Sequence, residues 1–202
     1  MATGYILVIK FRQDILERVG RFAFKETNMP GKTKAKRIAI LIEKQYQDME
    51  VWYPYLRLQE AGHEVQAIGV NETSYVGKYG YPIKCQTTID KVKSKNFDGV
   101  IVPGGWAPDF LRLSPKVLSF VADLDKKGKM VAAICHAGWV IASAKIVSGR
   151  KLTSYVAIRD DLVHAGAKWV DKEVVVDGNL ITSRTPNDLP AFLKEILKFL
   201  EK

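Results

Sequence analysis

One cysteine stands where a buried strand is expected to turn sharply into a helix. Residues 131–138 run Val-Ala-Ala-Ile-Cys-His-Ala-Gly, so that Cys135 ends an apolar run and His136 follows it. This is the nucleophile-elbow arrangement with Cys in place of Ser. A helix N-terminus at the sulfur would favour thiolate, and its free N–H groups could hold an oxyanion. The pattern predicts that Cys135 is a nucleophile, and a buried, inert thiol is the alternative.

Two further strand ends carry residues suited to the same chemistry. Residues 103–109 run Pro-Gly-Gly-Trp-Ala-Pro-Asp, and the N–H of Gly104 or Gly105 could supply a second oxyanion donor. Glu50 is expected in the first turn of a helix, where a carboxyl group facing a thiol can share its proton. The alternatives are an ordinary turn for the glycines and a helix-dipole acid for Glu50.

The elements that must position these residues follow a strand–helix alternation. Buried strands are expected over 38–42, 63–70, 99–102 and 130–134, and helices over 49–61, 115–127, 136–147 and 189–200, with Ser114 as an N-cap. Short antiparallel strands are expected within 73–89 and a hairpin over 173–182. This order predicts a flavodoxin-like α/β fold, in which a doubly wound, mostly parallel sheet has helices on both faces. Ligands of such sheets bind beyond the carboxyl ends of the strands.

Composition restricts the class of protein. The chain has 202 residues, 47% hydrophobic and 26% charged, which is typical of a folded globular protein. No apolar run approaches 18 residues, and a cytoplasmic location is expected. Two cysteines make no disulfide framework, and three scattered histidines lack zinc-site spacing. With no G-x-G-x-x-G or Walker A motif either, we expect neither a cofactor nor a metal ion.

The positive charge is concentrated at the start of the chain. Residues 1–37 hold nine Lys and Arg against three Asp and Glu, whereas the rest hold 22 against 19. We expect residues 1–35 to be a basic extension, with a short amphipathic helix near 15–22, and residues 36–202 to be the α/β domain. A surface arm is the favoured interpretation of the extension. A nucleic-acid or membrane contact is the alternative, and no such partner is clearly indicated.

Taken together, four motifs resemble those of the PfpI family of intracellular proteases. They are Glu50-Val-Trp-Tyr-Pro-Tyr, Pro-Gly-Gly-Trp-Ala-Pro-Asp, Ala-Ile-Cys-His and Thr153-Ser-Tyr155. Their order and spacing match over about residues 36–202. The resemblance implies a cysteine hydrolase of the class I glutamine-amidotransferase-like superfamily. Its members include intracellular peptidases and deglycases or glyoxalases, so that the implied substrate is a peptide or an early glycation adduct.

The resemblance also implies roles for individual residues. Cys135 would be the nucleophile and His136 its partner base, oriented by Asp109 from a neighbouring subunit. Glu50 matches the family's thiol-facing glutamate. Pocket positions are also implied, at Gly104, Gly105, Trp106 and Tyr155. A homo-oligomer with its active site at a subunit interface would follow.

Some residues depart from the family pattern and leave other functions open. Asp109 is one methylene shorter than the usual Glu, Gln47 stands where relatives are often acidic, and Trp139 is expected to narrow the pocket. A true glutamine amidotransferase is disfavoured because the late His-x-Glu motif is missing: the last histidine, His164, precedes Ala-Gly. The remaining alternative is a redox-sensing or chaperone-like stress protein without enzymatic activity, since an activated thiol beside a carboxyl group oxidises readily.

Overall fold

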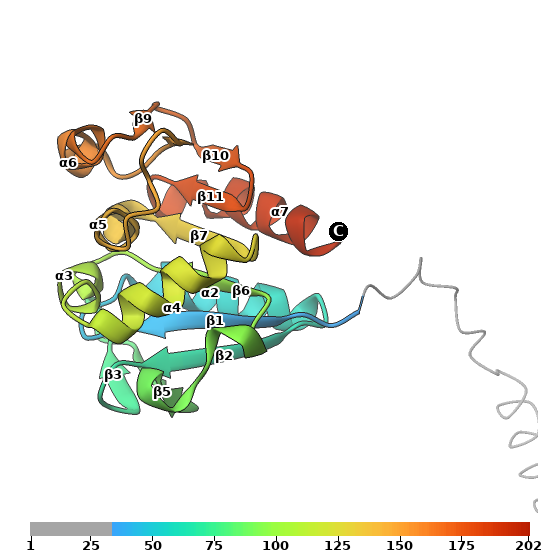
Figure 1. The fold of residues 1–202 in the computed structure, drawn as a ribbon. Coiled ribbons are helices and arrows are strands. Elements are labelled where there is room, and N and C mark those ends of the chain that lie inside the picture. The colour runs from blue at the N-terminus through green and yellow to red at the C-terminus, as the bar shows by residue number, and fades with distance from the viewer. Residues whose placement is uncertain (1–33) are drawn as a thin grey trace, which may run out of the picture. The chain divides into compact units, whose positions relative to one another are not determined.

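A seven-stranded sheet forms the centre of the domain in the computed structural model, which describes residues 34–202 (Figure 1). The strand order is β10-β11-β7-β6-β1-β2-β5, and every neighbouring pair is parallel except β10 with β11. The strands are β1 (Arg37–Ile42), β2 (Glu64–Gly69), β5 (Thr87–Thr88), β6 (Gly99–Val102), β7 (Met130–Ile134), β10 (Val174–Asp177) and β11 (Leu180–Ser183). The predicted extension and its helix lie outside the described residues.

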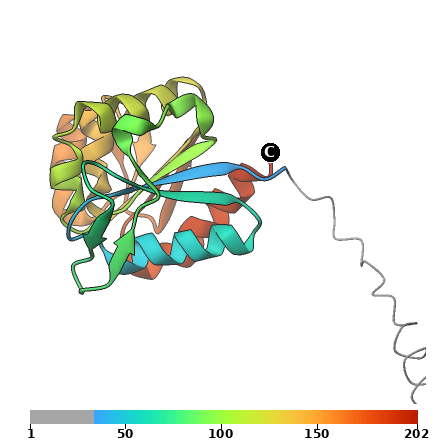
Figure 2. The same cartoon turned by 90° about the horizontal axis from the view of Figure 1, so that it is seen from below.

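Helices cover both faces of this sheet, as the strand–helix alternation predicts. They are α2 (Asp48–Glu60), α3 (Ala107–Leu111), α4 (Pro115–Lys126), α5 (Gly138–Ser143), α6 (Arg159–His164) and α7 (Leu189–Leu200). Figure 2 shows α2 and α7 together on one face, and α4 with α5 on the other. Every residue of β6 and β7 is buried, which explains their continuous apolar sequences. The predicted doubly wound fold is confirmed.

The sheet reverses its winding direction at β1. The next strand along the chain, β2, lies on one side of β1, and β6 lies on the other. Because β1, β6 and β7 are adjacent and parallel, their carboxyl ends at Ile42, Val102 and Ile134 meet at one edge. The three strand ends singled out by the sequence therefore converge at the topological switch point, where α/β sheets bind their ligands.

Three local predictions differ from the structure. Within residues 73–89, β3 (Ser74–Val76) and β4 (Pro82–Lys84) do form an antiparallel pair, but β5 joins the main sheet parallel to β2. The helix expected over 136–147 is instead a 3-10 turn followed by the short α5, which ends at Ser143, two residues before Lys145 adopts a φ of 60°. Two further strands, β8 (Lys151–Leu152) and β9 (Lys168–Trp169), pair in parallel outside the main sheet and were not predicted.

Two predicted local signals are confirmed. The Ser114 side chain caps α4 by accepting a hydrogen bond from the Val117 N–H. The Asp-Gly turn joins β10 to β11, with Gly178 at a φ of 61°. Among the helices of residues 34–202, none is both long and apolar enough to span a membrane.

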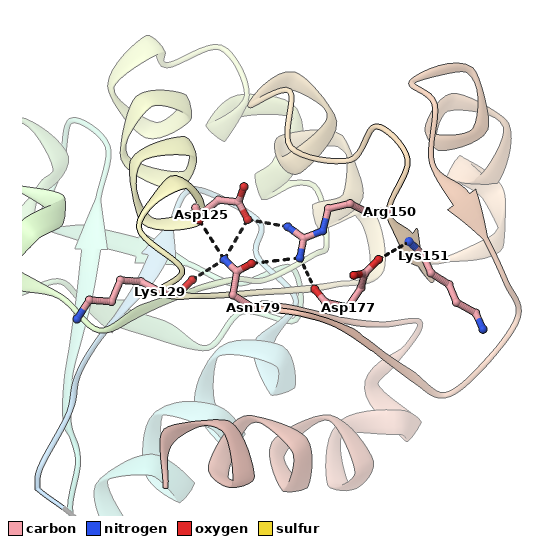
Figure 3. A network of polar contacts seen from close by, with 6 residues as sticks. All are labelled: Asp125, Lys129, Arg150, Lys151, Asp177 and Asn179. Atoms are coloured by element: carbon pink, nitrogen blue, oxygen red, sulfur yellow. Dashed lines mark hydrogen bonds and ion pairs between the residues drawn. The ribbon is translucent and has the colours of Figure 1, made fainter. Parts of the chain in front are cut away.

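A polar network joins this hairpin to the amino-terminal edge of the sheet (Figure 3). The Asn179 side-chain amide donates to the Asp125 carboxylate at 3.0 Å and to the Lys129 backbone carbonyl at 2.8 Å. Arg150 donates to the Asp125 carboxylate at 2.7 Å, to the Asn179 side-chain oxygen at 3.2 Å and to the Asp177 backbone carbonyl. One asparagine therefore ties together the end of α4, the start of β7 and the hairpin turn.

Replacing Asn179 should destabilise the domain. We expect Asn179→Ala to lower the free energy of unfolding by about 1–3 kcal/mol, because it leaves half-buried partners without their hydrogen bonds. Urea denaturation measures this, with Asn96→Ala as the control, since Asn96 is exposed and its side chain makes no hydrogen bond within residues 34–202. Equal losses of stability in the two variants would contradict the importance of the network.

Candidate active site

Cys135 lies at the tip of a strained turn directly after β7. Its φ is 63°, a left-handed conformation that costs a residue with a side chain roughly 1–3 kcal/mol. Its carbonyl accepts a hydrogen bond from the Tyr155 N–H at 3.2 Å, and a 3-10 turn continues the chain. Such strain persists only where the surrounding structure enforces it. The sharp strand-to-helix turn expected from the sequence is therefore present, with the half-buried thiol at its apex.

Glu50 approaches the same point from α2. Its side chain is fully buried, and its Oε2 accepts a hydrogen bond from the Gly104 N–H at 2.7 Å. A Cβ atom built on Gly104 would lie 2.7 Å from this oxygen and 3.0 Å from the Cys135 sulfur. A residue without a side chain is therefore required at position 104 for the carboxyl group and the thiol to converge. The other carboxyl oxygen, Oε1, is buried without a hydrogen-bond partner among residues 34–202.

The two acidic groups form a coupled pair. Burial raises the pKa of Glu50 to about 7, although the Gly104 N–H and Cys135 act in the opposite direction. Burial also raises the pKa of the Cys135 thiol to about 12, and the negative charge of Glu50 adds to this effect. Over a broad pH range the pair thus keeps one proton, which either group can hold.

This pair corrects the expected source of thiol activation. The sequence suggested that a helix dipole would favour thiolate, but α5 has only six residues. The backbone N–H groups of Gly105 and His136 lower the pKa of the thiol, yet burial and Glu50 outweigh them. Ionisation of Cys135 therefore depends on whether Glu50 takes up the proton.

The two glycines of the Pro-Gly-Gly segment have different roles. The sequence did not show which of them could be an oxyanion donor. The Gly104 N–H is engaged by Glu50, so that only the Gly105 N–H remains to join that of His136 at the sulfur. Gly105 has a φ of 77°, and a Cβ atom there would lie 2.5 Å from both the Gln45 carbonyl and the Gln47 nitrogen. The candidate oxyanion donors are therefore Gly105 and His136.

The His136 imidazole lies among aromatic rings. It stacks on Trp139, with ring centroids 5.1 Å apart and planes inclined by 19°. Tyr155 meets it edge-on at 5.0 Å, and Trp106 lies at 6.4 Å. Its Nδ1 lies 3.3 Å from the Gly105 carbonyl oxygen. The structure thus gathers the predicted pocket residues Trp106 and Tyr155 around His136; these two side chains are 53% and 38% exposed.

Asp109 is a predicted site residue that makes no bond to His136 of its own chain within residues 34–202. It lies in the first turn of α3 and is half-buried. Within residues 34–202, its carboxylate forms neither a hydrogen bond nor an ion pair with His136. Its role as an acid that orients the histidine of another subunit stays a prediction.

Some supporting residues were not identified from the sequence. Gln45, with a φ of 56°, accepts a hydrogen bond through its carbonyl from the Trp106 N–H, and Gln47 caps α2 by accepting from the Met49 N–H at 2.7 Å. Asp48 is buried and accepts from the N–H groups of Tyr79 and Tyr81 at 3.0 Å each. Gln is not one of the preferred N-cap residues, so the capping role of Gln47 has no clear sequence signal. The left-handed Gln45 has no such signal either.

Two cavities lie along the same sheet edge but away from the thiol. Their volumes are about 870 and 820 Å³, and both are lined by Val70, Asn71, Glu72 and Ser74 at the end of β2. Cys135 and Glu50 line neither of them. Residues 34–202 contain no group of three or more His, Cys, Asp or Glu side chains able to hold a metal ion.

Comparisons with known proteins show the family to which this chain is related. The family model for the DJ-1/PfpI family matches residues 36–199. Deglycase PH1704 of Pyrococcus horikoshii is 44% identical and deglycase PfpI of Pyrococcus furiosus 43% identical, each over 165 residues that cover 82% of this chain and 99% of the relative. The crystal structure of Drosophila melanogaster DJ-1beta is 32% identical, with a TM-score of 0.77 over 83% of this chain and 91% of that one. The chain belongs to the DJ-1/PfpI family.

Proposed function

We propose that this protein is a cysteine enzyme that removes early glycation adducts from thiols and amines. The observation that carries the proposal is the buried pair of Cys135 and Glu50, in which a nucleophile stands beside an acid whose pKa is about 7. A group that titrates near neutral pH can both take up and deliver a proton at that pH. Two relatives that share more than 40% of their residues with this chain are named deglycases, which supports the same chemistry.

The chemistry of such an adduct matches this pair. Methylglyoxal adds to a thiol or amine to give a carbinol carbon next to a ketone. The Cys135 sulfur bonds to the carbinol carbon, and the original thiol or amine leaves with a proton. Glu50 as carboxylate then takes the proton from that carbon and returns it to the neighbouring carbon, while the carbinol O–H proton moves to the ketone oxygen, so that the ketone becomes an alcohol and a thioester remains on Cys135. Water hydrolyses the thioester to lactate, and the internal exchange requires no external oxidant.

The surrounding groups have roles in the same steps. The N–H groups of Gly105 and His136, which lower the pKa of the thiol, would hold the oxygen that becomes negative during thioester hydrolysis. The His136 imidazole would deliver the proton to the departing thiol or amine. With its pKa raised to about 7, Glu50 is in part a carboxylate at neutral pH, the form that can take the proton from the carbinol carbon.

Amide hydrolysis is the second candidate activity, and one observation favours it. Two backbone donors at a cysteine sulfur are what a tetrahedral acyl intermediate requires. A peptidase would also need His136 to accept the thiol proton, whereas the group nearest to the thiol that can accept it is Glu50. Deglycation is therefore the better-supported reaction.

Replacing the nucleophile tests the reaction. With the methylglyoxal hemithioacetal of N-acetylcysteine as substrate, we expect Cys135→Ser to lower kcat/KM by at least about 100-fold, because the bond to the substrate is lost. Release of free thiol and of lactate measures turnover, and a fluorogenic peptide tests the second candidate activity. Cys85→Ala is the control, since Cys85 is the other free cysteine and lies in the core. Wild-type protein that turns over neither substrate while peroxide oxidises Cys135 would favour the stress-sensor alternative.

The raised pKa of Glu50 makes stability depend on pH. The folded state holds the Glu50 proton up to about pH 7, whereas the unfolded chain releases it near the ordinary value of 4.5. The raised pKa therefore has no effect on the free energy of unfolding below pH 4.5 and lowers that free energy increasingly as pH rises to 7. Glu50→Gln keeps the acceptor for the Gly104 N–H and removes the charge. We expect it to raise the free energy of unfolding by roughly 3 kcal/mol at pH 8 and by less than about 1 kcal/mol at pH 5.

Urea denaturation at the two pH values measures this difference. Glu60→Gln is the matched control, because Glu60 is exposed at the other end of the same helix. A gain for Glu50→Gln that is equal at pH 5 and pH 8 would show that Glu50 is not a neutral acid in the folded protein.

We further propose that the protein forms a homo-oligomer in which Asp109 completes the site of a neighbouring subunit. The support is the position of Asp109, half-buried on α3 and without contact to the His136 of its own chain. When the imidazole is protonated, a carboxylate from another subunit could accept a hydrogen bond from its Nε2–H and hold the ring in one orientation.

Mixing two inactive variants tests this arrangement. Cys135→Ser and Asp109→Ala should each be weakly active, because each lacks one part of the site. In a mixed dimer, one site pairs a normal Cys135 with a normal Asp109, so re-associated mixtures should recover about a quarter of wild-type activity. Turnover after joint refolding measures the recovery, and each variant refolded alone is the control. No recovery from a mixture shown to contain mixed oligomers would exclude Asp109 as a shared residue.

A further inference from the structure

The Trp139 ring contacts His136 face to face. The two rings are nearly parallel, at 5.1 Å between centroids, whereas Tyr155 and Trp106 meet the imidazole at steep angles. Trp139 belongs to α5, the helix that follows the cysteine turn. Its indole therefore forms the flat surface against which the imidazole rests.

Trp139 is itself held by two neighbouring elements. Its indole N–H donates to the Asp161 carboxylate on α6 at 2.7 Å. The guanidinium of Arg112, at the end of α3, lies 5.7 Å from the Trp139 ring and donates to the Ser143 hydroxyl at 3.0 Å. The hydrogen bond sets the rotation of the indole, and the cation adds an attraction of about 0.5–1 kcal/mol. The ring is thus fixed before any substrate binds.

The hydrogen bond of His136 defines which ring nitrogen carries the proton. Nδ1 lies 3.3 Å from the Gly105 carbonyl oxygen, which can only accept. Nδ1 must therefore hold a hydrogen in this orientation, and in the neutral ring Nε2 is then the nitrogen with a free lone pair. A rotation of the imidazole about its bond to Cβ would break the bond to Gly105 and remove this selection.

We infer that Trp139 is a positioning residue for His136, and that Asp161 acts through it. The hydrogen-bonded indole holds the imidazole against the Gly105 carbonyl, so that one tautomer dominates and Nε2 is the nitrogen that exchanges protons. Trp139 has no bond to the substrate in this role and sets only the rate of the proton-transfer step. The effect on turnover rests on the proposed function, whereas the effect on the tautomer does not.

Two adjacent aspartates on α6 make the test specific. Asp161 accepts the indole N–H, whereas Asp160 is exposed and pairs only with Arg159 among residues 34–202. We expect Asp161→Ala to lower kcat for the N-acetylcysteine hemithioacetal about 3- to 10-fold with KM within twofold, and Asp160→Ala to change neither. Asp161→Asn keeps an acceptor oxygen and should restore kcat to within about twofold of wild type.

Replacing the ring itself should have a larger effect. We expect Trp139→Leu to lower kcat about 10- to 100-fold, because the imidazole loses its supporting surface. Trp139→Phe keeps an aromatic face without the N–H and should fall between wild type and Trp139→Leu. The alkylation rate of Cys135 by iodoacetamide should stay within about twofold in Trp139→Phe, since that thiol is governed by Glu50 rather than by the indole.

The imidazole ¹⁵N shifts of His136 separate positioning from mere packing. Wild type and Asp160→Ala should show a protonated Nδ1, and Asp161→Ala and Trp139→Leu should show mixed tautomers. The same tautomer in all four proteins, with equal kcat, would overturn the inference. If wild type shows no turnover while the tautomers still shift as described, the proposed function fails and the positioning role of Trp139 stands.

Discussion

The hydrogen bond from the Gly104 N–H to Glu50 is the contact on which the rest of the site depends. It is buried, and it is the one conventional hydrogen bond that the Glu50 carboxyl group makes within residues 34–202. Without this donor the buried Glu50 side chain would have no hydrogen bond to offset its desolvation, since burial of an unpaired acid is costly. With it, the acid is held beside a sulfur that it can protonate or deprotonate. The end of β6 and the start of α2 must therefore lie side by side at the carboxyl edge of the sheet.

The parallel sheet provides that match and withstands the strain that follows. Left-handed backbone is found at the two non-glycine residues that shape this edge, Cys135 and Gln45, as well as at Gly105. Each of these turns lies at the end of a strand whose residues are almost all buried, so that tertiary packing outweighs the local cost. Backbone strain at the edge where chemistry occurs thus lowers stability, and the packing of the buried strands compensates for it.

Much of this arrangement could be predicted from local signals. Continuous apolar runs that end at Pro-Gly-Gly and at Cys-His indicate buried parallel strands and place their ends at one edge. What could not be predicted depends on distances between segments remote in sequence. No local pattern shows that Gly104 rather than Gly105 serves Glu50, or that Asp161 bonds to Trp139 across 22 positions. The overestimated helix after Cys135 has a similar cause, because its apolar residues pack against α3, α4 and α6 and conceal where the helix ends.

The site separates two kinds of proton chemistry. Glu50 is buried and Cys135 is half-buried in one chain, and the pKa values of this pair are set by burial, by the charge of Glu50 and by backbone donors. His136 lies among partly exposed rings, and within its own chain a carbonyl and an indole hold it. An imidazole held in this way can accept a proton at Nε2 and pass it to a leaving group without competing with Glu50 for the thiol. The aromatic surface under His136 therefore keeps the second proton carrier independent of the first.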